Sequence, residues 1–134
     1  MSLGKIIVIE GSDGSGKNTQ TLASLKLARE NNYNIETLSF PDYSTHSGKL
    51  IEDYKNGNLW GDPVKVDPYF VAPLYALNRL EKKNEIVDWL NDGINVILDR
   101  YVESNIAHQG CKLNEEERKN FIEWILDREY NKYG

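Results

Sequence analysis

The sequence has little cysteine, no long apolar run and no excess of basic residues. Cys111 is the one cysteine among 134 residues, so no disulfide can form within the chain, and we expect a reducing, cytoplasmic location. No apolar run approaches the ~18 residues that a membrane-spanning helix requires. The N-terminus leads straight into a strand-like run and does not have the pattern of a secretory signal. We therefore expect no membrane partner.

The charge balance excludes another class of partner. The net charge is -5, from 16 Lys and Arg against 21 Asp and Glu, whereas proteins that bind nucleic acid polymers usually carry a clustered basic face. A small phosphorylated ligand needs only a few local cations and remains compatible. Hydrophobic residues make up 40% of the chain and charged residues 28%, a mixture typical of globular proteins. The length suits one domain over residues 1–134.

Strand-like and helix-like segments alternate along the chain. The β-branched run at 5–10 predicts a buried strand, and residues 68–91 predict one long helix that Pro73 kinks or delays. Asn114 and Glu117 are spaced as a capping box at the start of the last helix. The alternation predicts an α/β fold with a parallel sheet. The expected strands are 5–10, 35–40 and 95–98, and the expected helices are 17–29, 47–54, 68–91 and 114–130.

A glycine-rich loop follows the first strand. Gly11-Ser12-Asp13-Gly14-Ser15-Gly16-Lys17 fits the first seven positions of G-x-x-x-x-G-K-[ST]. Glycines there let backbone N–H groups turn toward phosphate oxygens, and the following helix and lysine add positive charge. A chance glycine-rich turn is the alternative, but a strand before the loop and a helix after it favour the phosphate site. The predicted ATP phosphate-binding residues are Gly11, Ser12, Asp13, Gly14, Ser15, Gly16, Lys17, Asn18 and Thr19.

One position departs from this loop pattern. The hydroxyl that usually follows the lysine and binds Mg²⁺ is replaced by Asn18. The amide oxygen of Asn18 can coordinate Mg²⁺, whereas Thr19 points elsewhere on the helix.

A second chemical element ends the third strand, where Asp99 is followed by Arg100. The carboxyl ends of parallel strands are where open α/β sheets bind ligands. Asp99 could hold Mg²⁺ directly or through water, and Arg100 could meet a transferring phosphoryl group. A surface ion pair at a strand end is the alternative, and the phosphate loop favours the functional interpretation.

A third element lies on the predicted long helix. Tyr75 and Arg79 are four residues apart, so they share one helix face. An aromatic ring and a cation on one face can stack on a base and hold a phosphate. Spacing alone equally fits an amphipathic arginine at the edge of the core. The turn Phe40-Pro41-Asp42-Tyr43-Ser44 leaves the second strand toward the same sheet edge.

These motifs, in this order, resemble those of the thymidylate kinase family. The matching stretches are residues 9–20, the turn at 40–44 with Ser47-Gly48, Tyr75-Ala76-Leu77-Asn78-Arg79, and Asp99-Arg100-Tyr101 with Ser104. The resemblance implies a three-layer α/β/α fold of the P-loop NTPase type with a parallel sheet of order 2-3-1-4-5. It also implies phosphoryl transfer from ATP to dTMP, giving dTDP, with Mg²⁺ as cofactor and a homodimeric assembly.

The resemblance also implies roles for matching residues. Asp13 would contact the sugar 3′-hydroxyl of dTMP, Tyr75 would stack on thymine, and Arg79 would help to hold the monophosphate. Lys17, Asp99, Arg100 and Asp13 would form the catalytic group, with Asp99 and Asn18 at the metal. The implied dTMP-binding residues are Asp13, Pro41, Tyr43, Tyr75, Arg79, Arg100, Ser104, Asn105 and His108.

Several features depart from the family pattern. Besides Asn18, Tyr43 stands where many members have an arginine, and Gly14 stands where one subgroup has a catalytic arginine. The chain stops at Gly134, before the arginine-bearing lid and the last two strands, so we expect an incomplete domain with the first strand at an exposed edge. Another nucleoside or nucleoside-monophosphate kinase is one alternative function. A non-catalytic nucleotide-binding remnant or dimerisation module is the other.

Overall fold

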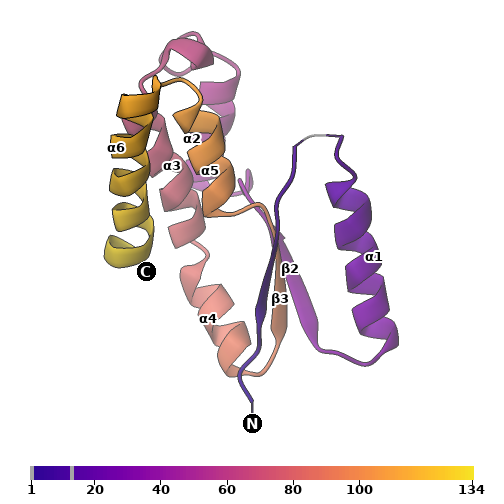
Figure 1. The fold of residues 1–134 in the computed structure, drawn as a ribbon. Coiled ribbons are helices and arrows are strands. Elements are labelled where there is room, and N and C mark those ends of the chain that lie inside the picture. The colour runs from indigo at the N-terminus through magenta and orange to yellow at the C-terminus, as the bar shows by residue number, and fades with distance from the viewer. Residues whose placement is uncertain (1, 13) are drawn as a thin grey trace. The chain divides into compact units, whose positions relative to one another are not determined.

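The computed structural model, which describes residues 2–12 and 14–134, contains a three-stranded parallel sheet (Figure 1). The chain divides into two compact units. We call Met1–Phe40 with Glu81–Tyr101 the sheet unit, and Pro41–Leu80 with Val102–Gly134 the helical unit. The elements are β1 (Ile6–Ile9), α1 (Lys17–Glu30), β2 (Ile35–Ser39), α2 (His46–Lys55), η1 (Pro63–Lys65), α3 (Pro68–Leu80), α4 (Lys83–Asn91), β3 (Asn95–Asp99), α5 (Val102–Gly110), α6 (Glu115–Leu126) and η2 (Asp127–Lys132).

The sheet unit is built around strand β3, which lies between β1 and β2. Both pairings are parallel, and Asp99 at the end of β3 stands opposite Ile9 on one side and Ser39 on the other. Val96 and Leu98 are fully buried. They form a core cluster with Phe40 and Ile86, so helix α4 covers this part of the sheet. The parallel α/β fold and the strand order 2-3-1 are confirmed.

Strand β1 is not buried as its sequence predicts. Ile6, Ile7 and Val8 are 48%, 49% and 40% exposed. The reason is its position, because in the described part of the chain β1 pairs with β3 on one side only. The expectation of an exposed apolar edge at this strand is therefore confirmed, and the burial inferred from its composition is wrong.

The helical unit contains α2, α3, α5, α6 and η2. Ala72 of α3 packs in a fully buried cluster with Phe121 and Ile125 of α6. The predicted capping box at the start of α6 is present: the Asn114 side chain accepts from the Glu117 N–H at 2.9 Å, and Glu117 accepts from the Asn114 N–H. None of the helices within residues 2–12 and 14–134 is both long and apolar enough to cross a membrane.

The single helix predicted over 68–91 is wrong. The structure divides it into α3 and α4 with a turn at residues 81–82, while Pro73 lies inside an unbroken α3. The two helices pack into different cores, since Ala72 of α3 lies in the core of the helical unit and Ile86 of α4 lies in the core of the sheet unit. The apolar residues on the two sides of the polar run at 81–85 therefore pack against different partners.

Candidate active site

The loop between β1 and α1 has the backbone that phosphate binding requires. Gly14 and Gly16 have φ values of 77° and 88°, which other residues rarely adopt. Gly16 directly precedes α1, and among the described residues no side chain caps the first N–H groups of that helix. Such an open helix N-terminus favours an anion. A side chain at Gly11 would lie 2.6 Å from Ser15 Oγ. Asp13 lies outside the described residues.

Lys17 and Asp99 form an ion pair at the carboxyl end of the sheet. Lys17 Nζ donates to Asp99 Oδ1 at 2.5 Å, and the two side chains are only 10% and 12% exposed. The hydroxyl of Ser39 donates to the other carboxylate oxygen of Asp99 at 3.3 Å. The carboxylate thus lies between the loop lysine and the neighbouring strand. The two sequence motifs predicted to cooperate are brought together by the structure.

The backbone just after Asp99 is unusual. Arg100 has a φ of 66°, a strained value for a side-chain-bearing residue that is often found at functional sites. Its N–H donates to the Ile9 carbonyl at 2.9 Å. The next N–H, of Tyr101, donates to Glu10 Oε1 at 2.6 Å. Both contacts come from the end of β1, which therefore holds the backbone on either side of the Arg100–Tyr101 peptide.

The oxygen donors near Asp99 are of the type that Mg²⁺ prefers. A carboxylate and the hydroxyl of Ser39 meet at the strand end, and Mg²⁺ binds such oxygens together with phosphate and water. Asn18 follows Lys17 in α1 and is exposed. Within residues 2–12 and 14–134 no cluster of three or more His, Cys, Asp or Glu side chains forms a complete metal site. The residues therefore fit a metal that shares its coordination with phosphate oxygens.

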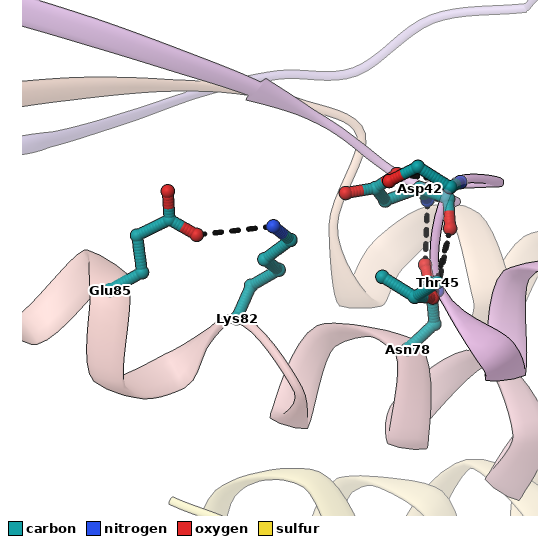
Figure 2. Close-up of polar contacts among 6 residues, drawn as sticks. Asp42, Thr45, Asn78, Lys82 and Glu85 are labelled. Carbon is teal, nitrogen blue, oxygen red and sulfur yellow. Dashed lines mark hydrogen bonds and ion pairs between the residues drawn. The ribbon is translucent and has the colours of Figure 1, made fainter.

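In the helical unit, the turn after β2 is attached to helix α3. Figure 2 shows Asn78 reaching the backbone of Asp42 and the side chain of Thr45. The figure also shows an ion pair within the sheet unit, between Lys82 and Glu85 at 3.1 Å. Tyr43 is 39% exposed, and its hydroxyl accepts from Lys55 Nζ at 2.8 Å. A lysine of α2 thus contacts the exposed tyrosine of the turn.

Arg79 is held by an acidic side chain that sequence reasoning did not identify. Its guanidinium forms a two-pronged ion pair with Glu129 of η2, in which Nε donates to Oε2 at 3.2 Å and Nη2 donates to Oε1. The two side chains are 5% and 4% exposed. Tyr75, four residues earlier on α3, is half-buried. Arg79 is therefore a buried, neutralised arginine and not one that extends to the surface.

Helix α5 carries the remaining predicted nucleotide-binding residues. Asn105 is buried and its Nδ2 donates to the Ala72 carbonyl at 3.0 Å, whereas His108 is exposed and Ser104 half-buried. In the described part of the chain, Asn105 Oδ1 and Gln109 Oε1 are buried acceptors without a hydrogen-bond partner. Such buried acceptors without a partner are rare in native structures.

The residues that sequence reasoning missed have different kinds of signal. Ser39 could have been found from strand register, because it ends β2 opposite Asp99. Glu129 is 50 residues from Arg79, and no local pattern links the two.

Comparison with known proteins gives one consistent result. A family model described as "Thymidylate kinase" matches residues 9–123. Among curated proteins, the thymidylate kinase of Schizosaccharomyces pombe is 36% identical over 109 residues, which are 81% of this chain and 50% of that protein. The thymidylate kinase of Plasmodium falciparum is 37% identical over 112 residues, or 83% of this chain and 50% of the other. The chain spans about half the length of these relatives.

Solved structures agree with this result. A thymidylate kinase from Candida albicans has a TM-score of 0.74 and 33% identity, covering 95% of this chain and 57% of that one. A thymidylate kinase from Ehrlichia chaffeensis has a TM-score of 0.63 and 23% identity, covering 91% and 66%. The second likeness concerns the fold alone.

Proposed function

This chain belongs to the thymidylate kinase family, and on that premise we propose that it takes part in phosphoryl transfer from ATP to dTMP, giving ADP and dTDP. The observation that carries the proposal is the ion pair between Lys17 and Asp99, 2.5 Å long, at the carboxyl end of a parallel sheet. A phosphate-loop lysine and a strand-end carboxylate in contact are the parts that position and neutralise phosphate groups.

In this proposal the residues around the loop mainly bind and neutralise charge. The backbone N–H groups at Gly11–Gly16 and the start of α1 receive the ATP phosphates, and Lys17 moves from Asp99 toward the terminal phosphates. Arg100 neutralises charge on the transferring group. Asp99 and Asn18 would hold Mg²⁺, which supplies further charge neutralisation when bound. The catalysis rests on alignment and electrostatics, since phosphoryl transfer needs little covalent help from the protein.

In this proposal the helical unit binds the nucleoside monophosphate. Tyr75 stacks on the base, and the buried acceptors of Asn105 and Gln109 fit a base that carries an N–H donor, as thymine does. Glu129 fixes the orientation of Arg79, which helps to hold the monophosphate. From family membership alone we further assign Asp13 to the sugar 3′-hydroxyl, and Pro41, Tyr43, Ser104 and His108 to the wall of the dTMP site.

A coupled assay of ADP release tests the reaction. Purified protein with ATP, Mg²⁺ and dTMP should release ADP, and omission of dTMP should abolish the release. A panel of dTMP, dUMP, dCMP and thymidine then tests the base and the phosphate separately. No release with dTMP, together with no dTMP binding in calorimetry, would show the proposed substrate to be wrong.

We also propose a homodimer located in the cytoplasm. Exposed apolar residues on α3, with Phe70 at 61% and Leu77 at 41%, support self-association of the helical unit. Analytical ultracentrifugation should give twice the monomer mass, and a Phe70→Glu substitution should return the monomer mass. Fluorescence microscopy of a tagged protein tests the location.

A further inference from the structure

We propose that Asn78 is a positioning residue that holds the turn at residues 41–45 against helix α3 and thereby sets the affinity for the phosphate of the nucleoside monophosphate. The inference rests on the proposed function, which places Pro41 and Tyr43 in the monophosphate site. Asn78 acts through the turn and needs no contact with the substrate.

The side-chain amide of Asn78 pairs with both backbone groups of Asp42. Oδ1 accepts from the Asp42 N–H at 2.7 Å, and Nδ2 donates to the Asp42 carbonyl at 3.0 Å (Figure 2). Asn78 is 1% exposed. A buried backbone N–H and carbonyl need partners, and here one amide side chain provides both, as a neighbouring strand would. This one side chain therefore pairs with both main-chain groups of Asp42.

The same amide reaches the start of helix α2. Nδ2 lies 3.0 Å from Thr45 Oγ1 and 3.0 Å from Ser47 Oγ. Thr45 is the N-cap of α2, because its Oγ1 accepts from the Gly48 N–H at 3.1 Å, and it also donates to the Asp42 carbonyl at 3.1 Å. Two N–H groups of Nδ2 are thus shared among three oxygens. The network joins α3, the turn and the cap of α2.

Packing fixes the turn from its other side. A Cβ atom at Gly48 would lie 1.9 Å from the Asp42 carbonyl oxygen and 2.6 Å from Tyr43 Cα. The backbone of the turn therefore lies directly on α2, with no space for a side chain. The Asp42 carboxylate accepts from the Ser44 N–H at 2.9 Å and from its hydroxyl at 2.6 Å. Tyr43 and Ser44 remain exposed on this rigid frame.

The position of Asn78 on α3 explains why rigidity matters for ligand binding. Tyr75 lies one helical turn before Asn78, and Arg79 follows it directly. The helix that carries the proposed base-stacking residue is therefore the helix to which the proposed phosphate-binding turn is fastened. Preorganised binding groups avoid the entropic cost of ordering on binding. Loosening the turn should weaken phosphate binding while leaving base binding almost intact.

The test compares dTMP with thymidine, which lacks the phosphate. Asn78→Ala removes the hydrogen bonds of the Asn78 amide to Asp42, Thr45 and Ser47. Thr45→Val removes the link to Asp42 together with the cap of α2, and it serves where Asn78→Ala does not fold. Asn114→Ala is the matched control, because it removes a helix N-cap of α6 in the same unit without touching the turn. Calorimetry with each nucleotide gives the dissociation constants, and hydrogen exchange reports on the Asp42 amide.

We expect Asn78→Ala and Thr45→Val to weaken dTMP binding about tenfold, as for loss of one charge-assisted hydrogen bond, with less than about a twofold effect on thymidine. The Asp42 amide should exchange faster in both variants, and Asn114→Ala should change neither affinity. Equal losses for dTMP and thymidine, or unchanged dTMP affinity in folded Asn78→Ala, would overturn the positioning role alone. A wild-type protein that binds neither nucleotide would instead overturn the proposed function, and this inference with it.

Discussion

Replacing Glu129 by glutamine should destabilise the helical unit by about 3 kcal/mol, because it breaks the ion pair with Arg79 inside the protein. The side chains of Arg79 and Glu129 are 5% and 4% exposed, and two hydrogen bonds join them. Removing one partner of a buried pair typically costs about 3–5 kcal/mol, since an uncompensated charge remains. Glutamine keeps the shape and one acceptor oxygen, so the lower end of that range applies.

Two further variants separate the charge effect from packing. Arg79→Met combined with Glu129→Leu removes both charges and should cost less than about 1 kcal/mol, since apolar replacements of buried pairs are often neutral. Glu30→Gln is the exposed control. Its pair with Lys26 spans 3.8 Å with side chains 59% and 78% exposed, so its loss should cost less than about 0.5 kcal/mol.

Urea unfolding followed by circular dichroism gives the free energy of unfolding of each variant. Because the two buried charges are coupled, the double variant must be more stable than the Glu129→Gln variant. A loss below about 1 kcal/mol in Glu129→Gln would show that the pair is solvated in solution. Arg79→Met and Glu129→Leu, each made alone, complete the double-mutant cycle. A double variant that loses the sum of these two losses would show that the two charges do not interact.

Three other substitutions test the rest of the site. Asp99→Asn should lower the rate of ADP release by at least about a hundredfold, because Lys17 loses its ionic partner; an unchanged rate in the coupled assay would contradict this. Gly48→Ala should lower the free energy of unfolding by about 1–3 kcal/mol, since its Cβ would lie 1.9 Å from a backbone oxygen, whereas Gly110→Ala, with 3.5 Å of space, should change it by less than about 1 kcal/mol. Gln109→Met should keep or raise the melting temperature, because its buried oxygen has no partner within the described residues, yet weaken dTMP binding; a large loss of stability would argue for a structural role.

Local sequence patterns predicted the features whose interaction partners lie only a few residues away in the sequence. The capping box at Asn114 and the glycine loop before Lys17 depend on neighbours within a few residues, and both are present. The strand order followed from the family resemblance. The break after Leu80 was not predictable, because Glu81, Lys82 and Lys83 are good helix formers and no glycine or proline marks a stop there. Glu129 was equally hidden, since its contact with Arg79 spans 50 positions.

On helix α3, contacts with segments that are distant in the sequence involve two residues next to the proposed nucleotide site. Asn78 and Arg79 are 1% and 6% exposed, and an apolar pair in place of Arg79 and Glu129 is expected to be about as stable. Each instead needs hydrogen-bond partners from a segment distant in the sequence. Asn78 finds them in the turn at residues 41–45 and at Ser47, and Arg79 finds them in η2. Departures from the simplest stable choice are expected where binding geometry matters more than stability. The two buried polar residues therefore fix α3 in place, because each of them binds a different segment to the helix that carries Tyr75.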